Sequence, residues 1–215
     1  MGRTLRPCGA DPWTDLRCRV RGRVKLISRR SLPLLAVIWL VTGPPGAGKS
    51  TLVSRVVLRL KSAGVIVGGC STGERRSNGR RTGFEVKDLT TGSVGTLATA
   101  AGGLGPKVGK YRVNLNDLSK VGAAGLLKAA EISEVIVIDE VGPMELVSPE
   151  FRRAVGACVE SGKPLLAVVH ERLDDDLLNE LRENAAKSVS LTPENRIEAA
   201  EEVASEILTS MGLRR

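Results

Sequence analysis

The sequence has few aromatic residues, a single histidine and no apolar segment of membrane-spanning length. Aromatic residues make up 2% of the 215 positions, so the core must consist mainly of Val, Ile, Leu and Ala. This composition suits a buried parallel sheet flanked by helices. The apolar run from Leu32 to Val41 is ten residues long, which is too short to cross a bilayer and fits a buried strand. We therefore expect a cytoplasmic protein with no membrane partner.

Cysteine patterns typical of zinc sites and redox centres are also missing. Cys8, Cys18, Cys70 and Cys158 form no CxxC pair and show no zinc-type spacing. Cys70 and Cys158 fall in a predicted strand and a predicted helix. We interpret the cysteines as small buried thiols of a reducing cytosol rather than as ligands or disulfide partners.

The net charge of +8 is concentrated at the N-terminus. Residues 1–33 hold nine Arg and Lys and two Asp, whereas the remaining residues hold 23 basic and 22 acidic side chains. We expect 1–33 to be a disordered basic arm, or to be untranslated because the true start lies downstream; an organelle transit peptide is the third interpretation. Because the rest of the chain is nearly neutral, a nucleic-acid partner is unlikely on this sequence.

Residues 34–215 show the alternation of strands and helices that predicts one α/β domain. Within this domain, residues 72–110 are rich in Gly, Thr and Arg and predict hairpin strands inserted at one edge of the sheet. The fold class is thus α/β, with a mostly parallel sheet and helices on both faces. Strands are expected at 34–41, 65–71, 135–139, 164–170 and 188–191, and helices at 49–63, 114–130, 148–161, 174–184 and 192–211.

The sequence VTGPPGAGKST, residues 41–51, contains the phosphate-loop pattern GxxxxGK[ST] after an apolar run. Its glycines allow a tight turn whose N–H groups point at phosphate oxygens, and the following helix adds its positive dipole end. Lys49 is expected to bridge the β- and γ-phosphates, and Ser50 to bind Mg²⁺. The predicted nucleotide-binding residues here are Gly43, Pro44, Pro45, Gly46, Ala47, Gly48, Lys49, Ser50 and Thr51.

A second acidic motif, VIVIDEVGPMEL at 135–146, follows an apolar strand. Asp139 fits the acid that holds Mg²⁺, directly or through water, together with Ser50. Glu140 is placed to accept a proton from, or orient, a water behind the γ-phosphate. Ile138, Val141 and Gly142 are predicted to flank the nucleotide. Glu145 has two possible roles on the sequence: it is either a second metal ligand or an acid on the protein surface.

Together these segments resemble the THEP-type, or cancer-related, nucleoside-triphosphatases of the P-loop class. The resemblance covers about residues 36–200 and is carried by GPPGAGKSTL, CSTGERRSNGRRTGF, VGKYRVNL, VIVIDEVGPMELVSPEF and SLTPENR, in that order. It implies a RecA-like fold in which one strand separates the acidic strand from the phosphate-loop strand. It also implies Mg²⁺-dependent hydrolysis of ATP, GTP and other triphosphates. Cys70 and Gly73 depart from the family pattern, which commonly has an aromatic and an acid there.

Three further groups have candidate roles. Arg76 and Arg81 match basic positions of the family motif, and an arginine that closes over the γ-phosphate would stabilise transition-state charge; a solvated hairpin tip is the alternative. His170 ends a predicted strand, where it is either a sensor of the γ-phosphate or a structural residue. Asn195 and Arg196 either edge the base and ribose or lie on a helix surface.

The leading functional prediction is an NTPase that cleaves nucleoside triphosphates to diphosphate and phosphate. A nucleoside or nucleotide kinase is the alternative, and it would need an acceptor pocket, for which the 72–110 insertion is a candidate. A nucleic-acid-dependent ATPase that uses the basic N-terminus ranks last. The sequence indicates no oligomeric state.

Overall fold

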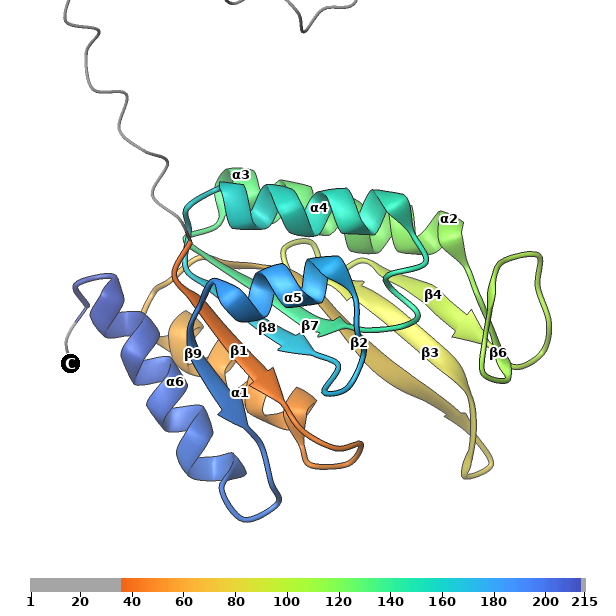
Figure 1. The fold of residues 1–215 in the computed structure, drawn as a ribbon, viewed down its shortest axis with the longest axis horizontal. Coiled ribbons are helices and arrows are strands. Elements are labelled where there is room, and N and C mark those ends of the chain that lie inside the picture. The colour runs from red at the N-terminus through yellow and green to blue at the C-terminus, as the bar shows by residue number, and fades with distance from the viewer. Residues whose placement is uncertain (1–35, 214–215) are drawn as a thin grey trace, which may run out of the picture. The chain divides into compact units, whose positions relative to one another are not determined.

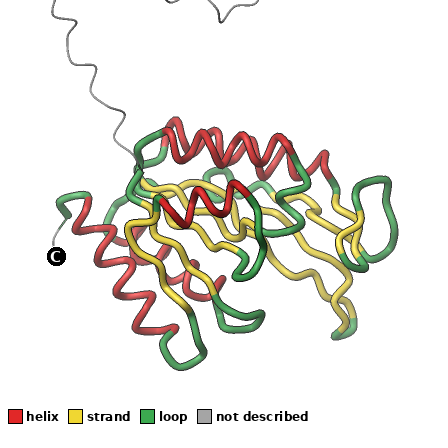
Figure 2. The backbone as a smooth tube through the Cα atoms, in the orientation of Figure 1, coloured by secondary structure: helices red, strands yellow, loops and turns green. Residues whose placement is uncertain are grey.

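The computed structural model describes residues 36–213, which form a mixed sheet with helices on both faces (Figure 1, Figure 2). The basic segment 1–33 lies outside this range, as does Leu34, where we expected the first strand to begin. In the described range, nine strands are ordered β5-β6-β4-β3-β2-β7-β8-β1-β9. They are β1 (Ile38–Thr42), β2 (Val67–Ser77), β3 (Arg80–Asp88), β4 (Val94–Thr99), β5 (Lys107–Val108), β6 (Tyr111–Val113), β7 (Val135–Val141), β8 (Leu165–Val169) and β9 (Ala185–Ser190).

Five neighbouring strands, β2, β7, β8, β1 and β9, pair in parallel. Strand β8 lies between β1, which leads into the phosphate loop, and β7, which carries the acidic motif. This confirms the expected RecA-like separation of the two motifs by one strand. Because parallel strands have their carboxyl ends at the same edge, the phosphate loop and the acids emerge on one side of the sheet.

The predicted edge insertion is confirmed as an antiparallel extension of the same sheet. The second strand is longer than expected, because β2 pairs with β7 only as far as Ser71 opposite Asp139 and then continues to Ser77. It turns at Asn78–Gly79 and returns as β3. β4, β6 and β5 follow in antiparallel pairing. The β2–β3 hairpin therefore projects about 20 Å past the level of Asp139 on the carboxyl side of the sheet.

Seven helical segments cover the two faces of the sheet in the described range. On one face lie α3 (Ala124–Ile132), α4 (Pro149–Glu160) and α5 (Asp176–Glu183), with α2 (Leu115–Asp117) and the π-helical segment η1 (Leu118–Ala123). α1 (Lys49–Ser62) and α6 (Arg196–Ser210) pack on the other face (Figure 1). Side chains of β7 alternate between these layers, with Val135 and Val137 toward α1 and α6, and Ile136 and Ile138 toward α3 and α4. By the same alternation Asp139 faces α1.

The helix expected over 114–130 is instead three segments with a π-helical turn in the middle. Gly122 and Gly125, which weaken the helical pattern, lie against strand β3. A Cβ added to Gly122 would stand 3.3 Å from Val86 Cγ2, and one added to Gly125 would stand 3.0 Å from Asp88 Cγ. The glycines therefore permit a close approach of this helical region to the sheet, and the local helix geometry adapts to it.

The last helix begins at Arg196, four residues after the predicted start at Thr192. Asn195 closes a turn ahead of the helix: its Oδ1 accepts from the Thr192 N–H at 2.9 Å, and its Nδ2 donates to the Ser190 carbonyl at 3.0 Å. This local pairing of an amide side chain with backbone groups favours a turn over the first helical turn.

Candidate active site

The phosphate loop joins β1 to α1 and requires glycine at two positions. Gly43 has φ 145, and a Cβ there would stand 2.6 Å from the Leu191 carbonyl oxygen. Gly48, which precedes the first helical residue, has φ 98. The Ala47 N–H donates to the Pro44 carbonyl at 3.2 Å and closes the turn between them. The loop thus presents Pro44, Pro45 and Gly46 to solvent and ends on the exposed first turn of α1, at Ser50 and Thr51.

Lys49 is held by the loop that it is expected to serve. Its Nζ donates to the Gly43 carbonyl at 2.9 Å and to the Pro44 carbonyl at 3.3 Å. These carbonyls keep the ammonium group over the loop. A phosphate bound there would compete with them for the same three N–H donors.

Asp139 lies at the end of β7, opposite α1, with 3% of its surface exposed. The Ser50 hydroxyl lies near its carboxylate and lowers the pKa of Asp139, so the two predicted metal ligands are neighbours. Burial, and to a smaller extent the adjacent Glu140, raise the pKa of Asp139, whereas the Ser50 hydroxyl and Lys49 lower it, and the net pKa is about 7. A hydroxyl and a carboxylate form an all-oxygen donor pair, which suits Mg²⁺.

Glu140 and Glu145 both have a carboxylate beside Gly142. A Cβ added to Gly142 would stand 3.2 Å from an oxygen of each. Glu140 is half-buried and so accessible to water, and the peptide bond between it and Asp139 is cis. Glu145 is buried, and its Oε2 accepts from the Gly142 N–H at 3.1 Å. Of the two possibilities left open for Glu145, a surface acid is therefore wrong.

The pKa of Glu145 leads to a pH-dependent stability. Burial raises this pKa most, Glu140 and Asp139 add to the rise, and the backbone N–H groups of Glu145 and Gly142 oppose it; the net change is from 4.5 to about 8. Between these two pH values the folded chain keeps a proton that the unfolded chain releases, so stability falls as pH rises through the window. Glu145→Gln keeps an oxygen for Gly142 and removes the ionisation. We expect it to match wild type near pH 4.5 and to exceed it at pH 9 by on the order of 4 kcal/mol.

Urea denaturation at several pH values measures this difference. Glu160→Gln, an exposed carboxyl on α4, is the matched control and should follow the wild-type pH profile. Parallel profiles for wild type and Glu145→Gln would contradict the assigned ionisation.

Arg76 and Arg81 lie on the β2–β3 hairpin, and the structure does not bring them to the phosphate loop. Both guanidinium groups pair with Glu74, Arg76 at 2.6 Å. Arg81 also stacks over Phe84, whose ring packs against the core on the α3 and α4 side. They therefore project from the sheet face opposite to Asp139 and Ser50. Their predicted contact with the γ-phosphate remains a prediction, and it requires the pairs with Glu74 to break.

Arg75 lies on the other face of the same hairpin and was not among the predicted site residues. Ser71 pairs with Asp139, and residues two apart on a strand share a face, so Ser71, Gly73 and Arg75 face the α1 side. Arg75 Nη1 donates to Thr96 Oγ1 at 3.1 Å. Arg75 can be selected by taking every second residue of β2 from Ser71, the partner of Asp139. That choice requires the pairing register of β2 with β7, which the sequence does not provide.

His170 follows β8 and lies next to the acidic strand. Its N–H donates to the Val141 carbonyl at 3.1 Å, and its own carbonyl accepts from Arg182 Nη2 at 2.9 Å. Nδ1 accepts from the Arg172 N–H at 3.3 Å, which puts the ring proton of a neutral imidazole on Nε2. His170 thus ties β8, β7 and α5 together, and its role as a sensor of the γ-phosphate remains a prediction.

The loop between β9 and α6 borders the phosphate loop on the side away from β7. Besides the contact of Leu191 with Gly43, the Arg196 side chain lies against Gly48: a Cβ there would stand 3.2 Å from Arg196 Cδ. The phosphate loop therefore lies between the acids of β7 on one side and Arg196 on the other.

The metal and membrane predictions concern residues 36–213, the part of the chain that the structure describes. No group of three or more His, Cys, Asp or Glu in this range is arranged to hold a metal ion. An ion held by Ser50 and Asp139 would therefore complete its shell with water and substrate oxygens, as Mg²⁺ commonly does. Within the same range, every helix is too short or too polar to cross a bilayer.

Cys70 and Cys158 are buried free thiols, as predicted.

Comparison with known proteins identifies the family. A family model described as NTPase matches residues 38–204. Nucleoside-triphosphatase THEP1 of Thermofilum pendens is 44% identical over 171 residues, which are 79% of this chain and 94% of that protein. The chain belongs to the THEP1 nucleoside-triphosphatase family. THEP1 of Methanosarcina acetivorans is 40% identical over 173 residues, 80% of this chain and 97% of its own length.

Solved THEP1-like structures agree with the fold. The crystal structure of THEP1 from the hyperthermophile Aquifex aeolicus superposes with a TM-score of 0.69 at 29% identity, covering 80% of this chain and 99% of the other. The solution structure of a human cancer-related nucleoside triphosphatase gives 0.70 at 32% identity, covering 84% and 100%. The predicted P-loop NTPase fold, family and enzyme class are confirmed. The matched range includes each THEP1-type motif found in the sequence.

Proposed function

We propose that this chain hydrolyses ATP, GTP and other nucleoside triphosphates to diphosphate and phosphate, with Mg²⁺ at Ser50 and Asp139 and with a water activated by Glu140. The observation that carries the proposal is the proximity of the Ser50 hydroxyl to the buried Asp139 carboxylate, with Lys49 and Glu140 close enough to act on the same carboxylate. It joins the phosphate-binding loop and the acidic strand into one site.

The loop supplies the binding of the triphosphate. Its N–H groups and the start of α1 attract phosphate oxygens, and Lys49 exchanges the Gly43 and Pro44 carbonyls for the β- and γ-phosphates. Ser50 and Asp139 would hold Mg²⁺, which neutralises charge on these phosphates when bound. A single carboxylate and a hydroxyl leave room for substrate oxygens in the metal shell.

Glu140 supplies the proton acceptor for the attacking water. It follows the metal-binding Asp139 directly, and its half-buried carboxylate is accessible to solvent. A water between this carboxylate and the γ-phosphate would lose a proton to Glu140 as the bond to phosphorus forms. The products are a nucleoside diphosphate and inorganic phosphate.

Loose base selectivity is part of the proposal. The sequence has no motif of the kind that reads guanine in GTPases, and Arg196 is the charged side chain that borders Gly48 on the side away from β7. A long flexible arginine can border several bases or the ribose without discriminating among them. We therefore expect ATP, GTP, CTP and UTP to be hydrolysed at comparable rates.

Phosphate release from these four triphosphates, with Mg²⁺ and with a chelator, tests the proposal. Release that needs Mg²⁺ but no acceptor supports hydrolysis. If labelled phosphate appears on an added nucleoside or monophosphate with little free phosphate, the hydrolase proposal fails and the kinase alternative holds.

Arginine variants decide which guanidinium group reaches the phosphates. Provided that Arg81 leaves its pair with Glu74 and closes over the γ-phosphate, where it would stabilise transition-state charge, we expect Arg81→Ala to lower kcat by roughly 100-fold or more with little change in KM. Arg75→Ala tests the arginine on the face shared with Asp139. Arg80→Ala, at the same hairpin tip, is the matched control and should leave both constants near wild type. Equal losses in kcat and in affinity would make Arg81 a binding residue only.

A further inference from the structure

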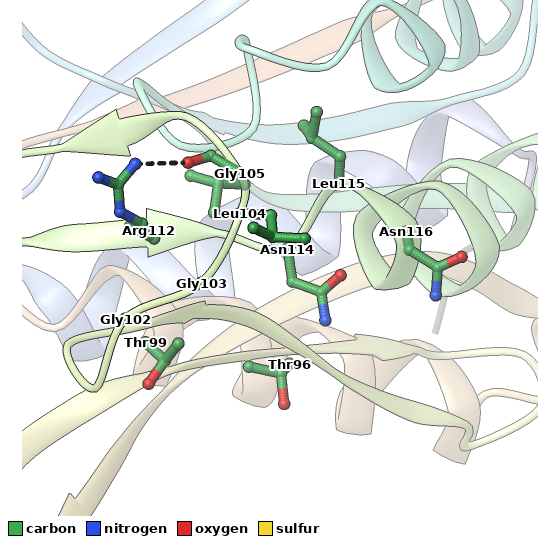
Figure 3. Close-up of a pocket in the computed structure, with 11 residues that line it drawn as sticks. Thr96, Thr99, Gly102, Gly103, Leu104, Gly105, Arg112, Asn114, Leu115 and Asn116 are labelled. Carbon is green, nitrogen blue, oxygen red and sulfur yellow. Dashed lines mark hydrogen bonds between the residues drawn. The ribbon is translucent and has the colours of Figure 1, made fainter.

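A cavity of about 510 Å³ lies in the edge insertion, away from the phosphate loop. We call it the β4–β6 pocket. Strands β4 and β6, the loop 102–105 and the start of α2 form its walls (Figure 3). Its lining includes the side chains of Thr96, Thr99, Leu104, Arg112, Asn114 and Asn116. This volume is within the range of small-molecule sites.

The polar groups of the pocket are almost all uncharged. Arg112 is the one ionic residue in its lining, and Arg112 Nη1 already donates to the Gly105 carbonyl at 3.1 Å. Asn114 caps α2 by accepting the Asp117 N–H at 3.1 Å through Oδ1. Figure 3 shows the remaining Nδ2 of Asn114 directed toward Thr96. Hydroxyl and amide groups without a surplus of charge favour a ligand that is polar and neutral.

Apolar side chains line the same cavity. Leu104 is fully exposed in the described structure, although it lies in the pocket wall. Leu115, which is half-buried, adds further apolar surface. A flat ligand that covered Leu104 would remove it from water while its edges met the amides and hydroxyls. A neutral heterocycle combines such a face with such an edge.

The pocket lies on the same sheet face as Asp139. Ser71 of β2 pairs with Asp139 of β7, and Gly73 lies two residues further along β2 and so on the same face. Gly73 pairs with Glu85 of β3, and Glu85 pairs with Thr96 of β4, so Thr96 in the pocket wall shares this face. Strand β4 is three strands from β7, about 14 Å across the sheet, and it lies on the far side of β7 from the phosphate loop. This step rests on the proposed function: with a triphosphate bound at the phosphate loop, the pocket lies beyond the γ-phosphate end of the nucleotide. The distance of about 14 Å between β4 and β7 exceeds the roughly 3–3.5 Å between reacting atoms that direct phosphoryl transfer to a pocket ligand would need.

We propose that the β4–β6 pocket is a second binding site, separate from the nucleotide site, for a small uncharged heterocycle of nucleobase to nucleoside size. Thr96, Thr99, Asn114 and Asn116 bind its polar edge and Leu104 covers its face. Occupancy of the pocket does not require the phosphate loop.

Calorimetric titration of the full chain with adenosine, guanosine, cytidine, uridine and the free bases, in saturating ADP and Mg²⁺, tests this proposal. We expect saturable binding of at least one probe. Leu104→Asp and Asn116→Leu, both at exposed positions, should weaken it at least about tenfold. Leu58→Asp is the matched control, since Leu58 is 68% exposed on α1; it should bind as wild type does.

Three results would overturn the second site: no saturable binding at millimolar probe, probe binding that weakens as the ADP concentration is raised from zero to saturation, or equal binding by wild type and Leu104→Asp. Thermal unfolding of each variant shows that it is folded. Phosphate release measured on the same samples reports on the proposed hydrolysis alone, so failure of the one does not count as failure of the other.

Discussion

Glu140→Gln is expected to lower the rate of phosphate release by roughly 10²- to 10⁴-fold, the loss typical of removing a general base. Glutamine keeps the shape of the side chain and the oxygen beside Gly142, but it cannot accept the proton of the attacking water. The phosphate loop, Ser50 and Asp139 are unchanged, so triphosphate affinity should stay close to wild type. Single-turnover hydrolysis and calorimetric titration with a non-hydrolysable triphosphate measure the two effects separately.

The control for this experiment is Glu131→Gln, which removes an exposed carboxylate on α3 and should leave hydrolysis unchanged. Turnover of Glu140→Gln near the wild-type rate would show that Glu140 does not activate the water. Weakened binding with an unchanged chemical step would instead make Glu140 part of the metal or phosphate contacts.

Lys49→Ala should weaken triphosphate binding by about 2–5 kcal/mol, which is roughly 30- to 4,000-fold, the cost of truncating one partner of a buried charge pair. The loss should be smaller for the diphosphate, because one of the two bridged phosphate groups is missing. Since Nζ also bonds the Gly43 and Pro44 carbonyls, the loop without nucleotide loses two contacts as well. Titration with triphosphate and diphosphate in Mg²⁺ measures both losses.

Lys61→Ala, an exposed lysine at the other end of α1, removes the same charge without touching the loop and should bind as wild type does. If Lys49→Ala binds triphosphate with unchanged affinity, the assignment of 43–51 as the phosphate-binding loop is wrong. Thermal unfolding of both variants distinguishes a lost contact from a damaged fold.

The phosphate loop and the acidic strand were predictable because each is a short contiguous pattern tied to a strand end. Gly43, Gly48 and Lys49 are set by local backbone geometry and chemistry, and Asp139 follows four buried apolar residues. Where both motifs stand at the ends of parallel strands, the fold itself brings them to one edge. The sequence alone therefore predicted that these two motifs lie at one edge of the sheet.

The hairpin arginines show what the sequence did not determine. Which face a strand residue occupies depends on register, and a bulge shifts that count by one residue. The β2–β3 pairing shifts between Arg75 and Arg76. As a result the face of Arg81 cannot be obtained by counting along β3, and the faces of Arg75 and Arg76 follow from counting along β2 only once its register with β7 is known.

Two other features depend on contacts between distant segments. The π-helical turn at 118–123 arises where Gly122 and Gly125 meet strand β3. The β4–β6 pocket combines β4 with a loop and a helix start, none of which has a motif of its own. Local propensity holds no information on such contacts, because tertiary packing overrides it.

The position of β1 has a consequence for the order in which the protein folds. Ile38 pairs with Leu165, and Trp39 pairs with Lys187, so both neighbours of the first described strand come from the last third of the chain. During synthesis the segment that leads into the phosphate loop therefore waits, unpaired, until most of the polypeptide has left the ribosome. Nucleotide binding by nascent chains of increasing length should accordingly appear late, when β9 and the start of α6 become available to close the site.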